Sequence, residues 1–249
     1  MQILLPPSES KRAGGSGRPL DIDALALGSL GAQRRLVVDA LVALARDPEE
    51  AARVLRLSMR QTGDVAANAA LRDAPTMPAV DRYTGVLYDA LDAPSLDSAA
   101  RRWLGRRVLI HSAPLGPVGA LDPIPAYRLA ASTSLPGLPP ARRVWADAVT
   151  EALARAGASF ILDLRSEAYT ALGPVPAATA SAYVRVVSER ADGAVRALNH
   201  FNKHAKGALV RRLAQDRPRI SSCAAFVRWA DAAGLRVREG SAGELELVV

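Results

Sequence analysis

Two short apolar runs that end in polar residues constrain the fold more than any other feature. They are VLIHSAP (108–114) and FILDLRS (160–166), and the segment between them contains a predicted helix at 141–156. Runs of this kind are typical of central strands that helices cover on both faces. Strand, helix and strand therefore alternate along the chain, which predicts an α/β fold.

The N-terminal part of the chain extends this pattern. Residues 1–5 form an apolar run that Pro6 and Pro7 stop, which predicts a buried strand that leads into the polar loop SESKRAGGSGRP. Apolar residues then recur at three- and four-residue spacing in 31–46 and 48–72. This spacing predicts two or three amphipathic helices.

The C-terminal part has a different pattern. Residues 181–190 and 194–201 are typical of paired strands across a turn at 191–193, and LRVREGSAGELELVV closes the chain as a hairpin. Helices are predicted at 202–216 and 221–233. We therefore predict an α/β fold in a single domain, residues 1–249, with a mixed β-sheet flanked by helices and a C-terminal hairpin.

Charge and composition limit the classes of partner. The formal net charge is +7 and the sequence pI is about 10.1, which favours an anionic partner such as nucleic acid, a nucleotide or phosphate. The one cysteine, Cys223, excludes a disulfide framework within the chain. Neither a signal peptide nor a run long enough to span a membrane is present, so we expect a cytoplasmic protein without a membrane partner.

Rare residues gather in HFNKHAKGALVRRL, residues 200–213. This segment holds two of the three lysines and two of the three histidines of a chain whose other cations are almost all arginine. Lysine differs from arginine because its pKa falls readily on burial, so Lys203 and Lys206 are candidate functional residues, as is Lys11. His200 and His204 have the i, i+4 spacing of zinc ligands, but the glutamate of an HExxH motif and a third ligand are missing, so we predict no metal.

Polar residues also follow the predicted strand at 160–166. Asp163 alternates with apolar neighbours, so we expect it to be buried and to pair with Arg128 or with a lysine of residues 200–213. Ser166 is the expected N-cap of a following helix, and Thr84 is a possible cap at the start of another. His111, at the end of an apolar strand, is expected to be structural.

Five motifs in sequence order resemble the YaaA family of peroxide stress proteins. They are LLPPSESK, DRYTGVLYDAL, IPAYRL, LDLRSEAY and HFNKHAKGALVRRL. The resemblance covers nearly the whole chain and implies a fold peculiar to the family. It also implies a role in the oxidative stress response and a positively charged cleft that binds DNA through a helix-hairpin-helix-like element.

One segment departs from the family pattern. Where the family has a Ser-Gly-Leu-(Trp/Tyr)-Gly turn followed by Arg-Pro, this chain has SAPLGPVGALD at 112–122. The change removes an aromatic and a basic residue, and Pro117 lacks a backbone donor. Gly116 and Gly119 remain as candidate backbone contacts to a phosphate.

Three functions remain open at this point. The first is a DNA-binding protein of the peroxide stress response, which binds duplex or branched DNA largely independently of sequence. The second is an enzyme that acts on a nucleobase, a nucleotide or a related small anion by lysine or histidine chemistry. The third is an interaction protein that controls iron or recruits repair partners.

The candidate site residues are expected to meet in one electropositive cleft, and no cofactor is predicted. The candidate catalytic residues are Lys203, His200, Asp163 and Ser8. The candidate nucleic-acid or anion-binding residues are Lys11, Tyr83, Thr84, Arg128, Arg165, Ser166, Asn202, Lys206, Gly116 and Gly119.

Overall fold

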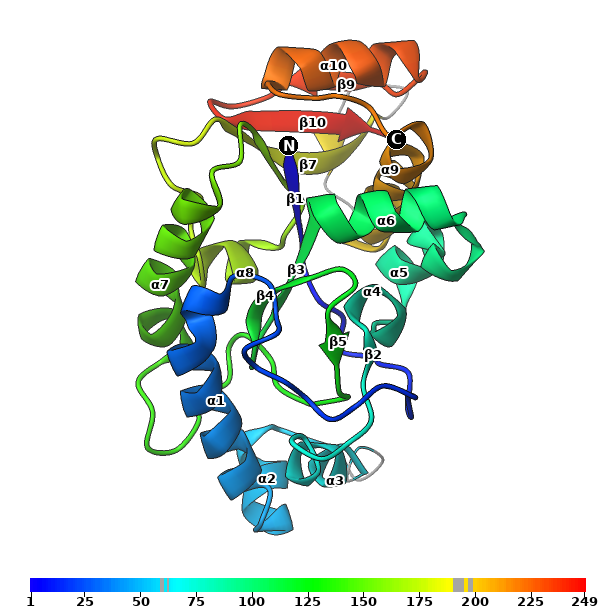
Figure 1. Cartoon of the computed structure of the whole chain (residues 1–249). Coiled ribbons are helices and arrows are strands. Elements are labelled where there is room, and N and C mark those ends of the chain that lie inside the picture. Colours follow the sequence, from blue (N-terminus) through cyan, green and yellow to red (C-terminus); the bar gives the residue numbers. More distant parts are fainter. Residues whose placement is uncertain (59–60, 62, 190–194, 197–198) are drawn as a thin grey trace.

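A mixed sheet forms the centre of the chain, which we describe from a computed structural model of residues 1–58, 61, 63–189, 195–196 and 199–249 (Figure 1). Within these residues the sheet has eight strands. The strands are β1 (Gln2–Leu5), β3 (Val108–Ser112), β4 (Gly116–Gly119), β6 (Ile161–Asp163), β7 (Ser181–Glu189), β8 (Val195–Arg196), β9 (Val237–Glu239) and β10 (Glu244–Val248). A separate two-stranded sheet pairs β2 (Met77–Pro78) with β5 (Pro123–Ile124).

The strand order is β4-β3-β1-β6-β7-β10-β9, and β8 pairs with β7. The five central strands are parallel to one another: β3, β1, β6, β7 and β10. The edge strands β4 and β9 lie antiparallel to β3 and β10. The antiparallel pair β9 and β10 is the predicted C-terminal hairpin. The prediction of a mixed α/β sheet is therefore confirmed.

Helices cover both faces of this sheet, with α1 and α7 on one side in Figure 1 and α5, α6 and α9 on the other. No helix among the described residues is long and apolar enough to cross a membrane. The helices are η1 (Gly28–Leu30), α1 (Gly31–Leu44), α2 (Pro48–Val54), α3 (Gly63–Ala69), α4 (Ala79–Arg82), α5 (Val86–Leu91), η3 (Ala93–Ser95), α6 (Ser98–Arg107), α7 (Ala141–Ala156), α8 (Glu167–Ala171), α9 (Asn199–Asp216) and α10 (Cys223–Ala232).

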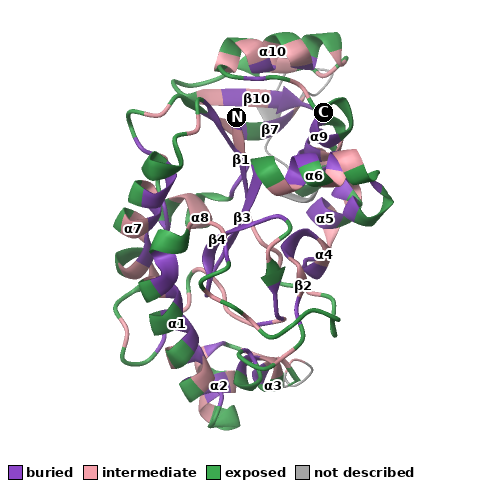
Figure 2. Ribbon diagram, in the orientation of Figure 1, coloured by how far each residue is buried: buried purple, intermediate pink, exposed green. Residues whose placement is uncertain are grey.

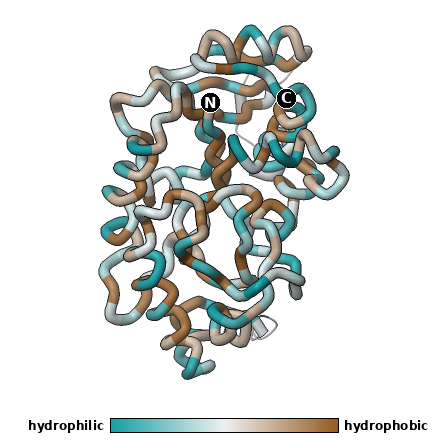
Figure 3. The backbone as a smooth tube through the Cα atoms, viewed as in Figure 1, coloured by the Kyte–Doolittle hydropathy of each residue, from teal (hydrophilic) through white to brown (hydrophobic). Residues whose placement is uncertain are grey.

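The core follows from the apolar runs of the sequence. Ile3, Leu4 and Leu5 of β1 are almost fully buried, as are all five residues of β3. Figure 2 shows these central strands as buried, and Figure 3 shows that the same part of the trace is hydrophobic. Strands buried on both faces need continuous apolar sequence, which is why they were recognisable from sequence alone.

Most predicted elements occur with small shifts. The helix predicted at 141–156 has those limits, and the helix predicted at 202–216 begins earlier, at Asn199. The region 48–72 forms two short helices, α2 and α3, and between them Arg56 has a positive φ of 54°. The predicted turn at 191–193 lies outside the described residues, although β7 and β8 on its two sides do pair.

Helices α5 and α9 approach each other closely at Gly207. A Cβ atom at this position would lie within van der Waals overlap of the backbone oxygen of Leu87. Gly207→Ala should therefore push the helices apart and destabilise the protein by about 1–3 kcal/mol, measured by urea unfolding. Gly63→Ala is the matched control, because a Cβ on this helical glycine meets no atom within 4 Å. Equal stabilities of the two variants would contradict the close contact.

Candidate functional site at the carboxyl ends of the strands

The parallel strands β1, β3 and β6 end at the same level. Leu4 pairs with Asp163 of β6, and Leu5 pairs with Ile110 of β3. The residues that follow these strands therefore meet at one edge of the sheet. In open α/β sheets this edge is the usual place for ligands.

A lysine–tyrosine cluster, defined as Lys11, Tyr83 and Tyr127, lies at this edge. The two tyrosine hydroxyl groups share a hydrogen bond of 2.7 Å, and both rings are almost fully buried. The Nζ atom of Lys11 lies 4.0 Å from the centre of the Tyr127 ring and 5.5 Å from that of Tyr83. Ser112, the last residue of β3, interacts with both phenol groups. Three distant segments of the sequence therefore enclose one amine.

The loop after β1 folds the side chain of Lys11 back over its own backbone. Its Nζ donates hydrogen bonds to the carbonyl oxygens of Ser8, at 3.0 Å, and Glu9, at 3.3 Å. Burial, together with the positive charge of Arg128, lowers the pKa of Lys11 to about 7. A lysine with such a pKa can accept and donate a proton near neutral pH, which arginine cannot do.

Arg128 closes one side of this cluster. Its guanidinium group pairs with Glu9 at 3.0 Å and lies 3.9 Å from Asp64 of α3. Its backbone N–H and C=O are both bonded by the buried side chain of Asn68. Arg128 is therefore fixed beside Lys11, with its charge already partly compensated.

Asp163 and Arg165 form a buried ion pair. Arg165 donates to the two carboxylate oxygens of Asp163 at 2.9 and 2.7 Å, and its side chain is completely buried. Its remaining Nη1 group donates to the carbonyl oxygen of Gly173 at 2.8 Å and to Nδ1 of His111 at 3.0 Å. The predicted partner of Asp163 was Arg128 or a lysine of residues 200–213, but the direct ion pair is made by Arg165, while Asp163 also interacts with the charge of Lys206. The ion-pair partner comes from the same motif, two residues later.

This arrangement fixes the tautomer of His111. Arginine can only donate, so Nδ1 accepts and the proton of the neutral ring is on Nε2. Nε2 is buried and has no hydrogen-bond partner among the described residues. Burial, together with the charge of Arg165, holds the pKa of His111 well below its usual range.

His111 should make stability fall in weak acid. Because its pKa is lowered in the folded state, the unfolded chain takes up a proton first when the pH drops below about 6.5, at a cost of about 1.4 kcal/mol per pH unit. Urea unfolding at pH 7, 6 and 5 should show this loss in the wild type and less of it in His111→Gln. Identical pH dependence in both proteins would rule out a buried neutral histidine.

A second buried lysine lies on the α9 side of the ion pair. Lys206 is 4% exposed, and its Nζ lies 5.4 Å from the ring centre of Tyr183. Burial lowers its pKa to about 8, although the negative charge of Asp163 opposes the shift. Asn202, one turn earlier on the same helix, has a buried Oδ1 atom without a hydrogen-bond partner in the part of the chain that the structure describes.

All five tyrosines of this aromatic-poor chain lie along this edge. Tyr83 and Tyr127 enclose Lys11, Tyr183 lies beside Lys206, and the Tyr169 ring lies 5.6 Å from that of His111. Tyr88 donates to the carbonyl oxygen of Pro6 at 2.7 Å. The sequence motifs did not predict that the five tyrosines lie together. The signal that could have indicated it is the small aromatic content of the chain, 4% of residues.

The structure brings only some of the predicted site residues together. Ser8, Lys11, Tyr83 and Arg128 are neighbours, and Asn202, Lys206 and Asp163 form a group on the α9 side. Lys203 and His204 are exposed, although the i, i+3 spacing puts Lys203 near the same face of α9 as the buried Lys206. The side chain of His200 lies outside the described part of the chain.

Several predicted contacts have other roles. Arg165 is enclosed by the ion pair and so is unavailable to a phosphate. Gly116 and Gly119 lie in the buried edge strand β4, where the N–H of Gly119 donates to Asp122 at 2.8 Å. The hairpin of residues 112–122 is therefore part of the sheet, and its two glycines are buried.

The two predicted helix caps also differ. Ser166 is the N-cap residue of α8 but makes no capping hydrogen bond through its side chain. Helix α5 begins after Gly85, so Thr84 is not its cap, and the N–H of Thr84 instead donates to Ser10 at 3.1 Å. Thr84 thus fixes the loop that carries Lys11.

The described residues contain no group of three or more His, Cys, Asp or Glu that could hold a metal ion.

Comparison with known proteins gives matches that extend beyond the five sequence motifs. The chain matches a family described as peroxide stress protein YaaA over residues 1–240. A UPF0246 protein of Corynebacterium efficiens is 44% identical over 255 residues, which covers 100% of both chains. One from Corynebacterium glutamicum is 43% identical over 96% of this chain and 95% of its own, and one from Streptomyces coelicolor is 44% identical over 86% and 82%.

Proposed function

Because the chain belongs to the YaaA family of peroxide stress proteins, we propose that it acts in the peroxide response on a small anionic ligand at the lysine–tyrosine cluster. The ligand class is a nucleobase, a nucleotide or a related anion, and the reaction uses Lys11 as the acid–base group. We also propose that the protein acts in the cytoplasm.

The position and pKa of Lys11 are the observation that supports this proposal. An amine with a pKa of about 7 that lies 4.0 Å from a tyrosine ring, at the carboxyl edge of parallel strands, combines three features of a reactive site. Lys11 is only partly exposed, and its loss of solvent favours the neutral form of the amine.

The surroundings suit an anionic ligand. The two tyrosine rings are almost fully buried and support the amine from the protein side, and a protonated lysine attracts negative charge. Ser8 is partly exposed next to Lys11 and offers a hydroxyl group as donor or acceptor. The amine would therefore bind the ligand from one side while Ser8 contacts it from the solvent side.

Ligand binding at different pH values tests this proposal. Thermal-shift screening with nucleotides and free bases should identify ligands, whose affinity is then measured by calorimetry at pH 6 and pH 8. Since Lys11 loses most of its charge between these values, affinity for an anion should fall by up to about tenfold. The proposal fails if no such ligand binds, or if a ligand binds equally to wild type and Lys11→Met at both pH values.

DNA binding is the second candidate, and the net charge of +7 supports it, with exposed Lys203 on α9 as a contact. Binding of this type should be largely sequence-independent and should weaken steeply with salt. An electrophoretic shift series against salt, with wild type and Lys203→Ala, tests it. Absence of any shift with duplex or branched DNA at low salt excludes this candidate.

A further inference from the structure

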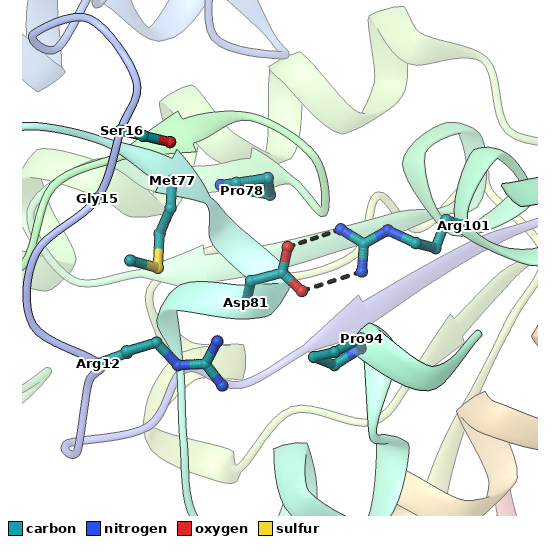
Figure 4. Close-up of a pocket in the computed structure, with 8 residues that line it drawn as sticks. All are labelled: Arg12, Gly15, Ser16, Met77, Pro78, Asp81, Pro94 and Arg101. Atoms are coloured by element: carbon teal, nitrogen blue, oxygen red, sulfur yellow. Dashed lines mark hydrogen bonds and ion pairs between the residues drawn. The ribbon is translucent and has the colours of Figure 1, made fainter. Parts of the chain in front are cut away.

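A pocket of about 400 Å³ lies away from the lysine–tyrosine cluster, on the other side of the N-terminal loop (Figure 4). Its walls come from this loop, from β2 and α4, and from η3 and α6. The lining residues are Arg12, Gly15, Ser16, Met77, Pro78, Asp81, Pro94 and Arg101. We call it the Arg12 pocket.

The extended backbone of the N-terminal loop places the side chains of Lys11 and Arg12 in two different sites. Lys11 forms an antiparallel bridge with Tyr83, and the N–H of Arg12 donates to the carbonyl oxygen of Arg82 at 2.8 Å. Successive side chains of an extended segment point to opposite sides. Lys11 therefore enters the lysine–tyrosine cluster, and Arg12 lines the pocket.

The walls are held by contacts that leave little freedom. A Cβ atom on Gly15 would lie 2.6 Å from the backbone oxygen of Thr76, so the loop approaches β2 as closely as only glycine permits. The buried guanidinium group of Arg82 donates to the carbonyl oxygens of Arg12, Pro75 and Ile124. The backbone of Arg12 is thus fixed independently of its side chain.

The charges of the pocket do not cancel. Arg101 and Asp81 form a two-pronged ion pair at 3.0 and 2.6 Å, which Figure 4 shows on the pocket wall. The Arg12 side chain makes no hydrogen bond or ion pair with any part of the chain that the structure describes. One unit of positive charge therefore remains, beside the apolar surfaces of Met77, Pro78 and Pro94.

We propose that the Arg12 pocket binds a small organic anion, whose carboxylate or phosphate monoester group is held by Arg12 and whose apolar body contacts Met77, Pro78 and Pro94. A guanidinium fork matches two oxygens of either anionic group. A pocket of a few hundred Å³ has room for a small ligand but not for a folded partner. This site is separate from the proposed function at Lys11.

Two probes and a pair of matched variants test this proposal. Phenyl phosphate and phenylacetate each combine one of the two anionic groups with an apolar ring. Calorimetry should show millimolar or tighter binding of at least one probe to the wild type, and Arg12→Gln should weaken this binding at least tenfold. Arg18→Gln removes the same charge from an exposed position of the same loop, outside the pocket lining, and should change the affinity less than twofold.

The outcomes separate a specific pocket from general charge attraction. Binding of only one probe identifies the anionic group. The proposal is overturned if neither probe binds, if Arg12→Gln binds as well as the wild type, or if Arg18→Gln loses as much affinity. Thermal unfolding without ligand checks that both variants are folded. Lys11→Met should retain probe binding, so this result is independent of the lysine–tyrosine cluster.

Discussion

Arg165→Ala should destabilise the folded protein by about 3–5 kcal/mol, because it removes the ion-pair partner of the buried Asp163 carboxylate. The same substitution removes the donors to Nδ1 of His111 and to the carbonyl oxygen of Gly173. Unsatisfied buried groups add to the cost, since the folded chain cannot return them to water. Urea unfolding followed by circular dichroism at pH 7 measures the effect.

Arg185→Ala is the matched control for this prediction. Arg185 also pairs with two carboxylates, Glu244 at 2.8 Å and Glu167 at 3.4 Å, but its side chain is 47% exposed. Exposed ion pairs contribute little, so the loss should stay below about 1 kcal/mol. A small loss in Arg165→Ala, similar to that of the control, would show that the Asp163 carboxylate is not isolated in the interior.

Lys11→Met should have opposite effects on stability and on activity. The folded state lowers the pKa of Lys11 to about 7, so at lower pH the charged amine is held in an unfavourable place. An apolar side chain of similar length avoids this cost and should stabilise the protein by roughly 1–2 kcal/mol at pH 6. The gain should shrink above pH 7, because stability that depends on a lowered lysine pKa rises with pH between the folded and unfolded values.

Activity should change in the other direction. Once a substrate of the lysine–tyrosine cluster is known, loss of its acid–base group should reduce turnover by about 10²- to 10⁴-fold. Lys203→Met is the control, since it removes an exposed lysine. Full activity in Lys11→Met, or destabilisation at pH 6, would contradict the assigned role.

The sequence was most informative where one physical rule dominated. Apolar runs buried on both faces identified β1, β3 and β6. Local sequence patterns did not show which residues of a helix are buried by tertiary packing. Nothing in the spacing distinguished the buried Lys206 from the exposed Lys203, because that choice depends on where α5 and β7 lie.

The sequence also did not show which residues and strands pair with one another. Asp163 was expected to need a distant cation, yet Arg165 satisfies it from two residues away because the chain turns at the end of β6. Gly116 and Gly119 were candidate backbone contacts to a phosphate, but pairing of β4 with β3 buries them. Loop composition alone does not show whether a glycine faces solvent or a neighbouring strand.

The pKa of Lys11 tests the central claim most directly. With three lysines in the chain, selective isotope labelling gives three side-chain signals, which single lysine variants assign. Titration by NMR should give a midpoint of about 7 for Lys11 and about 8 for Lys206. If the amine of Lys11 instead stays protonated up to pH 10, it is an ordinary solvated charge and the proposed acid–base site does not exist.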